Sequence, residues 1–183
     1  MSVEHFKGQF EVELKYRIAC PQEFKRALAE VPHEVRFEDN SETDWYYDTK
    51  NHSLRKDSKH LLLRDIQPAN IQLWIVKGPG GDDCEASDIL DLGAAKNMLS
   101  TLGYQLTLTM SKTRSMYFVG EYHITFDYLE GLGYFAEYAI MTDDESSLEY
   151  HRQQLISLAA KFSLGNNELE HSSYRTLFEN LSV

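Results

Sequence analysis

The stretch Glu11-Val12-Glu13-Leu14-Lys15 alternates charged and apolar side chains, and the alternation extends over residues 9–19. Successive side chains of a β-strand point to opposite faces, so this period of two predicts a half-buried strand. Glu11, Glu13 and Lys15 stand two residues apart and therefore project from the same face. That face meets either solvent or a ligand that binds both carboxylates and an ammonium group.

Strand patterns continue along the rest of the chain. Alternating or aromatic-rich runs bounded by turn residues predict further strands over residues 34–38, 43–48, 60–66, 71–77, a piece near Cys84, 105–119, 122–129 and 134–141. Gly120-Glu121 and Gly131-Leu132-Gly133 are typical of the turns that join the last three. The total, about eight strands, is within the usual range for one antiparallel sheet.

Three amphipathic helices are also expected. They begin at Pro21, after a cap at Asp91, and at Asp144 or Ser146. The linkers are short and no repeat interrupts the pattern, so residues 1–183 are expected to form a single domain. A mainly β chain with a few helices favours a closed or nearly closed antiparallel barrel with the helices packed outside, because closure removes exposed strand edges.

Composition excludes several classes of protein. The net charge of −11 argues against non-specific nucleic-acid binding, which needs a basic surface. No apolar run is long enough for a membrane span, and the first ten residues show no signal-peptide pattern, so a cytoplasmic protein is expected. Cys20 and Cys84 are far apart, and the seven histidines show no metal-ligand spacing, which disfavours a zinc site or a disulfide framework.

Several charged residues stand among apolar residues within the predicted strands, and they are the main indication of a functional site. The basic ones are Lys15, Arg64, Lys77, Lys112 and Arg114, and the acidic ones are Glu11, Glu13, Asp127 and Glu137. Any single one could face solvent, because antiparallel sheets commonly have one wet face. Taken together in a closed barrel, they would instead bind a polyphosphate through the cations and divalent metals through the carboxylates. Alternation alone leaves open which face points inward.

These residues carry a resemblance to a known family. The stretch 11–15 resembles the ExExK signature of the CYTH superfamily, also called triphosphate tunnel metalloenzymes, and Lys112-Thr113-Arg114 resembles its paired K-x-R strand. Residues 173–178 are similar to its closing SY-x-x-LL segment. More narrowly, residues 5–6, 74–80, 84–87, 117–120 and 131–137 resemble bacterial class IV adenylyl cyclases. Ala139 stands where a second carboxylate of the last strand is often found.

The resemblance implies a closed eight-stranded tunnel, a homodimer, and conversion of ATP to 3′,5′-cyclic AMP and pyrophosphate with Mg²⁺ or Mn²⁺, two per site. The implied triphosphate-binding residues are Lys15, Arg64, Lys77, Lys112 and Arg114. The implied metal ligands are Glu11, Glu13, Asp127 and Glu137. The implied catalytic residues are Glu13, Lys15, Lys112, Arg114 and Glu137. Glu85 is a weaker candidate near the tunnel mouth.

Three alternatives stay open at this point. A triphosphatase acting on thiamine triphosphate or inorganic triphosphate would have much the same charged lining. A non-catalytic polyphosphate-binding module would need the cations but no full set of carboxylates. A lipocalin-like carrier would need an apolar interior. Residue chemistry alone supports a metal-assisted triphosphate-binding barrel.

Overall fold

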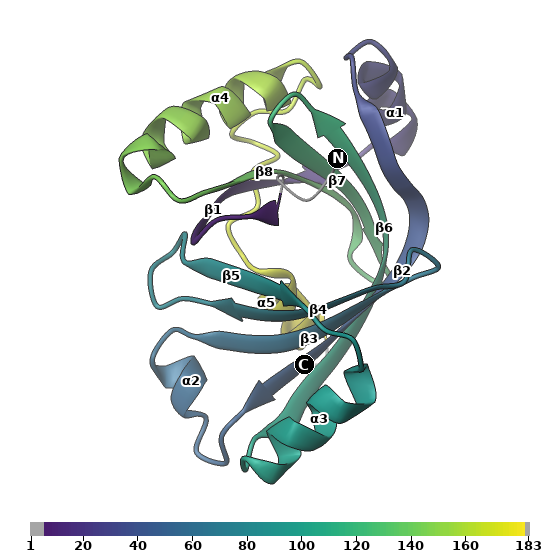
Figure 1. Ribbon diagram of the computed structural model, residues 1–183. Helices are drawn as coiled ribbons and strands as arrows, with labels where there is room; N and C mark the ends of the chain where they lie inside the picture. Colours follow the sequence, from purple (N-terminus) through teal and green to yellow (C-terminus); the bar gives the residue numbers. More distant parts are fainter. Residues whose placement is uncertain (1–5, 182–183) are drawn as a thin grey trace.

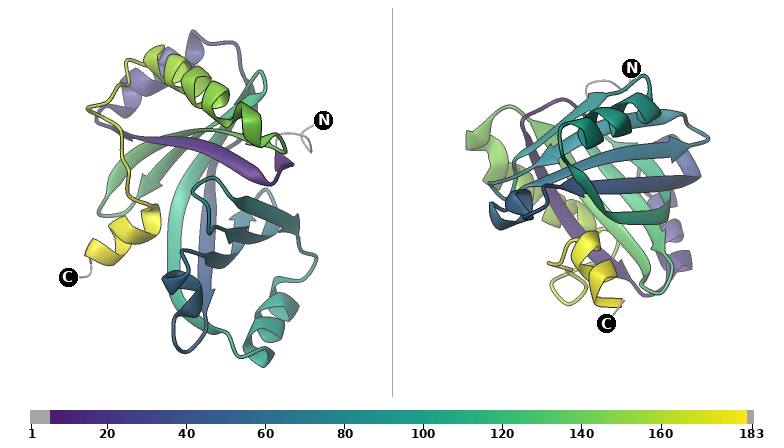
Figure 2. Two further views of the ribbon diagram at one scale, coloured as in Figure 1. Left: turned by 90° about the vertical axis from the view of Figure 1, so that its left-hand side faces the viewer. Right: turned by 90° about the horizontal axis from the view of Figure 1, so that it is seen from below.

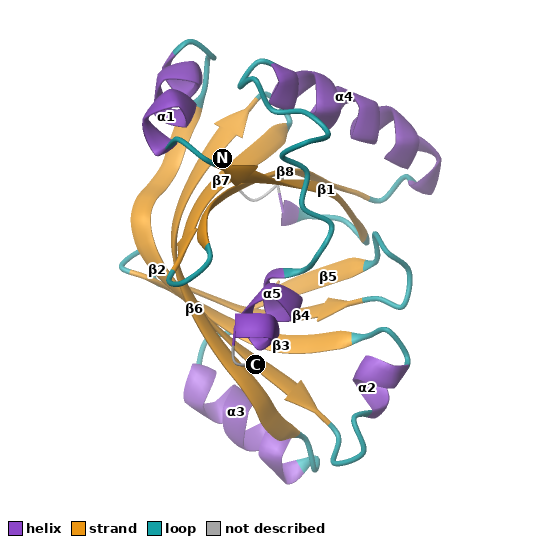
Figure 3. Ribbon diagram, turned by 180° about the vertical axis from the view of Figure 1, so that it is seen from behind, coloured by secondary structure: helices purple, strands orange, loops and turns teal. Residues whose placement is uncertain are grey.

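One eight-stranded antiparallel sheet dominates the computed structural model, which describes residues 6–181 (Figures 1 and 3). The strands are β1 (Phe10–Ile18), β2 (Glu34–Asp48), β3 (His60–Gln67), β4 (Ile71–Lys77), β5 (Cys84–Asp88), β6 (Gln105–Val119), β7 (Tyr122–Leu129) and β8 (Gly133–Thr142). Their order across the sheet is β1-β8-β7-β6-β2-β3-β4-β5, so the first and fifth strands are its edges.

The sheet curls until its two edges approach each other, and it forms an open half-barrel (Figure 1). The edges meet at one β-bridge, where the N–H of Glu11 donates to the carbonyl of Asp82 at 2.7 Å and that of Cys84 to the carbonyl of Gln9 at 3.0 Å. The predicted mainly β antiparallel architecture is confirmed, but full closure is not. The reason is register, because the bridge pairs Phe10 with Asp83, so β5, which begins at Cys84, runs past the start of β1 instead of along it.

Most predicted strands are found within one or two residues of their predicted bounds. The exception is that runs 34–38 and 43–48 belong to one strand, β2. Its register against β6 shifts between Val35 and Phe37 and again between Phe37 and Asn40, and Asp39 has a positive φ of 49°. β-Bulges interrupt the alternation of side chains without ending the strand, so the middle of β2 lacks the pattern that predicts a strand.

The helices are α1 (Pro21–Ala29), α2 (Ser53–Lys56), α3 (Leu92–Thr101), α4 (Leu148–Ala160) and α5 (Tyr174–Leu181), with a 3₁₀ turn η2 (Glu145–Ser147) before α4. The three predicted helices are confirmed, and Asp91 caps α3 by accepting from the N–H of Ala94 at 2.9 Å. The structure adds α2 and α5. Helix α4 lies across β1 and β8 on the convex side of the sheet, and α3 packs against β3 (Figure 2).

The main apolar core lies between the convex face of the sheet and the helices. Val12 and Tyr16 of β1 are buried there together with Phe24 of α1 and Leu155 of α4. The apolar side chains of β1 therefore point outward under the helices, and its charged side chains are left on the concave face. Among residues 6–181, no helix is long and apolar enough to cross a bilayer.

Candidate active site

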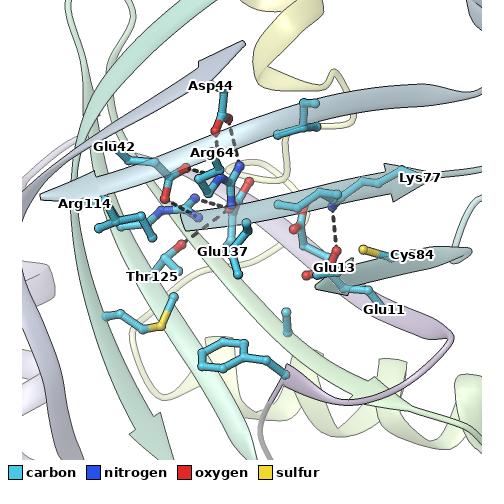
Figure 4. Close-up of a pocket in the computed structure, with 18 of the residues that line it drawn as sticks. Glu11, Glu13, Glu42, Asp44, Arg64, Lys77, Cys84, Arg114, Thr125 and Glu137 are labelled. Carbon is cyan, nitrogen blue, oxygen red and sulfur yellow. Dashed lines mark hydrogen bonds and ion pairs between the residues drawn. The ribbon is translucent and has the colours of Figure 1, made fainter. Parts of the chain in front are cut away.

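The concave face of the sheet encloses a cavity of about 530 Å³. It is lined by eight of the nine predicted site residues, namely Glu11, Glu13, Lys15, Arg64, Lys77, Lys112, Arg114 and Glu137. Figure 4 shows most of them converging from different strands on the same space. The ninth, Asp127, is fully buried behind this surface and does not line the cavity. Glu85 does not line it either, whereas its neighbours Cys84 and Ala86 do.

Strand register brings these distant residues together. Lys15 stands opposite Glu137 across the β1–β8 pair, and Thr125 stands opposite Glu137 across β7–β8. Arg114 stands opposite Asp127 across β6–β7. Directly opposed residues share a face of the sheet, so one layer of charge runs across four strands.

Arg114 is the centre of this layer. Its guanidinium donates to both oxygens of Asp127 at 2.6 Å and to Glu137 at 2.6 Å, and it lies 3.4 Å from Glu42. Burial raises the pKa of Glu137, but Arg114 and Lys15 outweigh burial and lower it to about 2. Glu137 is therefore a carboxylate, and its charge is compensated by two cations when no ligand is bound.

Two carboxylates of the site, Glu42 and Asp44 on β2, were missed from the sequence. Asp44 accepts two hydrogen bonds from Arg64 at 2.7 and 2.8 Å, and Glu42 lies 2.6 Å from the ammonium of Lys112. Burial raises the pKa of Glu42, yet Arg114, Arg64 and Lys112 hold it far below its usual range. The available signal was Glu42-Thr43-Asp44, the same i, i+2 spacing of carboxylates seen at Glu11 and Glu13, at the start of a predicted strand.

Glu11 and Glu13 are neighbours on β1 but differ in their surroundings. Lys77 donates to Glu11 at 2.5 Å, and although burial opposes it, this pair lowers the pKa of Glu11 to about 2. Glu13 forms no ion pair within the described part of the chain. Burial first, and then the charges of Glu137 and Glu11, raise its pKa to about 7. Lys77 and Lys15 are close enough to oppose this rise but do not cancel it.

The C-terminal segment also reaches the site. The hydroxyl of Tyr174 donates to Asp127 at 2.8 Å, and the ammonium groups of Lys15 and Lys112 lie 4.3 and 5.0 Å from the centre of its ring. Lys15 donates to the carbonyl of Ser172 at 3.0 Å. The resemblance had marked residues 173–178 as a motif without a role. In the structure, Tyr174 of this segment contacts two of the cations, Lys15 and Lys112.

The chemistry of the carboxylates fits a divalent cation, since Mg²⁺ and Mn²⁺ prefer hard oxygen ligands. Glu11, Glu13 and Glu137 supply such oxygens to the cavity from the adjacent strands β1 and β8. Within residues 6–181, no three acidic, histidine or cysteine side chains are already gathered as one set of ligands. Glu11 and Glu137 are turned toward Lys77 and Arg114, so a cation would have to compete for them.

The balance of charge in this network also favours a metal. Lys7, Arg36 and Arg175 also line the cavity, and the cations that form ion pairs inside this network are the five predicted ones, Lys15, Arg64, Lys77, Lys112 and Arg114. They face six carboxylates, Glu11, Glu13, Glu42, Asp44, Asp127 and Glu137. Buried charges need partners, and within this network six carboxylates face five cations.

Comparison with known proteins identifies the relatives of this chain. A family model described as "CYTH domain" matches residues 9–174. Adenylate cyclase CyaB of Aeromonas hydrophila is 55% identical over 179 residues, which cover 98% of this chain and 94% of that protein.

Solved structures agree with this result. The X-ray structure of a candidate adenylate cyclase from Vibrio parahaemolyticus has a TM-score of 0.92 at 50% identity, covering 97% of this chain and 100% of that one. A Hippeastrum protein whose structure is described as revealing a dominant triphosphatase activity has a TM-score of 0.60 at 13% identity, with 93% and 95% covered. The second likeness shows the fold alone.

Proposed function

Since the chain belongs to the CYTH family, we propose that it is a class IV adenylyl cyclase, which converts ATP to 3′,5′-cyclic AMP and pyrophosphate. The observation that carries this proposal is the 55% identity to adenylate cyclase CyaB over 98% of the chain. The cavity supports it, because every cationic residue predicted to bind the triphosphate lines the same space.

The cavity is larger and more apolar than a bare triphosphate requires. Met116 lies two residues beyond Arg114 on β6 and stands opposite Phe37 of β2, while Ile66 of β3 is opposite Glu42. These side chains continue the cavity wall past the charged layer. A nucleoside is flat and largely apolar, so this wall suits it, and the phosphates would then lie among the cations.

Catalysis requires the ribose 3′-oxygen to approach the α-phosphorus while charge on the leaving pyrophosphate is neutralised. We assign Lys15, Arg64, Lys77, Lys112 and Arg114 to the phosphates. Arginine can contact two phosphate oxygens at once, whereas lysine supplies a point charge. Water is excluded by the depth of the layer, since Lys112 and Arg114 are only 6% and 4% exposed.

Glu11, Glu13 and Glu137 would hold Mg²⁺ or Mn²⁺, with two ions per site as our expectation. When bound, the metal supplies a lowered pKa for the 3′-hydroxyl and additional positive charge beside the pyrophosphate. We assign Asp127, predicted as a fourth ligand, to Arg114 instead. Both of its oxygens are occupied, by Arg114 and by Tyr174, and it does not line the cavity.

A triphosphatase remains the second candidate, because the same cations could hold a terminal phosphate beside a water molecule. Incubation of purified protein with ATP and Mg²⁺, followed by identification of products, decides between them. We expect cyclic AMP and pyrophosphate from ATP and neither from 3′-deoxy-ATP, which lacks the nucleophile. Steady release of orthophosphate from inorganic or thiamine triphosphate, with no cyclic AMP from ATP, would establish the triphosphatase.

Four further expectations accompany this proposal. They are a homodimer, a cytoplasmic location, one domain over residues 1–183, and a fully closed tunnel when substrate is bound. The bridge between Phe10 and Asp83 already joins the two edges of the half-barrel at one end, and beside it the ion pair of Arg152 with Asp82 at 3.0 Å joins α4 to the β4–β5 loop. A structure with bound nucleotide would test the closure.

A further inference from the structure

The cations of the proposed triphosphate site do not stand alone. Arg64 lies on β3 and Lys112 and Arg114 on β6, and β2 runs between these strands. On the concave side of β2, Glu42 and Asp44 face all three cations. We refer to Glu42 and Asp44 as the β2 carboxylate pair.

The contacts of this pair are close and shared. One oxygen of Glu42 lies 2.6 Å from Lys112 and 3.0 Å from Arg64, and the other lies 3.4 Å from Arg114. Asp44 receives both donors of the Arg64 fork and lies 3.7 Å from Lys112. Figure 4 shows Asp44 and Arg64 directly opposed, with Glu42 between Arg64 and Arg114.

The burial of these groups makes the pair necessary. Both residues line the cavity, but Glu42 is only 1% exposed and Asp44 0%, and their oxygens lie against the cations. The buried Lys112 and Arg114 and the partly buried Arg64 would repel one another and draw in water or lose their order if the carboxylates were absent. A substrate phosphate arriving at such a site would meet cations without a defined spacing.

We propose that Glu42 and Asp44 are positioning residues, which set the spacing of Arg64, Lys112 and Arg114 for the triphosphate without touching substrate or metal. The pair gives Arg64 and Lys112 partners of opposite charge, and Arg114 is shared with Asp127 and Glu137. This inference rests on the proposed function only because that function names the reaction whose rate is measured. The arrangement of the cations would matter equally for a triphosphatase.

The decisive variant is Glu42→Gln, which keeps the size of the side chain and removes its charge. Removing a negative charge does not weaken the attraction of the site for phosphates. If Glu42 only positions the cations, the variant should therefore lose turnover but keep its affinity for triphosphate. We expect kcat to fall by about 100-fold, since small misplacements of catalytic groups have effects of that size. We expect the Kd of inorganic triphosphate, measured by calorimetry with Mg²⁺, to stay within about threefold of wild-type, well under the tenfold that 1.4 kcal/mol represents.

Two further variants complete the design. Asp44→Asn should give the same separation, and Glu42→Asp, which keeps the charge, should recover part of kcat. Glu34→Gln is the matched control, because Glu34 lies on the same strand and is exposed. If Glu42→Gln does not fold, Asp44→Asn and Glu42→Asp carry the measurement.

Three outcomes overturn the inference. One is wild-type kcat in both Glu42→Gln and Asp44→Asn. Another is a fall in kcat that excess Mg²⁺ reverses, which would make Glu42 a metal ligand. The third is a parallel loss of triphosphate binding and turnover in variants that are folded. If the wild-type protein makes no cyclic AMP, the proposed function fails, but triphosphate binding and orthophosphate release still test the positioning role.

Discussion

Glu13 is the carboxylate whose charge the metal-free protein tolerates least. Its pKa is raised from 4.5 to about 7, first by burial and then by Glu137 and Glu11. Between these values the folded protein holds a proton that the unfolded chain has released, so stability falls as the pH rises. The difference between the two pKa values corresponds to roughly 3 kcal/mol in the free energy of unfolding, and all of this stability is lost by about pH 8.

The substitution Glu13→Gln removes this charge with little change in volume. In EDTA at pH 8, we expect its free energy of unfolding in urea to exceed that of wild-type by up to about 3 kcal/mol. At pH 5, where Glu13 of the folded wild-type is protonated and the unfolded chain has only begun to gain from ionisation, the two proteins should agree to within about 1 kcal/mol. Adding Mg²⁺ at pH 8 should stabilise wild-type much more than the variant, and the variant should lose turnover.

Glu137→Gln is the matched control, because it changes the same residue type in the same cavity with the opposite expected sign. Glu137 pairs with Arg114 at 2.6 Å and Lys15 at 3.7 Å, so its loss leaves buried cations uncompensated. We expect a loss of about 3 to 5 kcal/mol at pH 8. Parallel pH profiles for wild-type and Glu13→Gln from pH 5 to 8 would refute the reasoning, since the Glu13 charge would then carry no cost.

Three other substitutions test the frame around the cavity. Asp127→Asn should cost about 3 kcal/mol in urea unfolding, because Arg114 stays buried without its two-point partner, and a loss below about 1 kcal/mol would contradict this. Tyr174→Phe removes one buried hydrogen bond to Asp127, so we expect a loss of about 1 kcal/mol and a smaller effect on kcat than that of Asp127→Asn. Arg152→Ala breaks the partly exposed ion pair between α4 and Asp82 of the β4–β5 loop, which should cost less than about 1 kcal/mol. It should nevertheless speed hydrogen exchange of the amides at 80–84, and unchanged exchange would show that the pair does not hold this loop in place.

Much of the site could be predicted because strand alternation records which side chains share a face. Glu11, Glu13 and Lys15 line the cavity as their spacing indicates, and Lys112 and Arg114 do the same on β6. Short charged alternations of this kind occur in many solvent-facing strands, so the inward direction depended on the family resemblance. The structure supplies the physical reason, since the apolar partners of these residues are covered by helices on the convex face.

Other features could not be predicted from local patterns. The β2 carboxylate pair lies in an acidic stretch that was divided into two strands, because bulges around Phe37 and Asp39 interrupt the alternation. Asp127 was predicted to be a metal ligand because it is a charged residue within an otherwise apolar strand and matches the family pattern. Only the register of β6 against β7 places Arg114 across from it and so covers both of its oxygens.

The sequence by itself determined the class of fold, most of the strands and the kinds of chemical group available, because these follow from local periodicity and residue type. Tertiary structure alone decided how far the sheet closes, which carboxylate neutralises which cation, and that Glu13 forms no ion pair among residues 6–181. Those outcomes depend on register, strand length and curvature, which bring residues as distant as Lys15 and Glu137 to within 3.7 Å. Ion pairs between buried groups form across strands, and no period within one strand specifies the partner on another.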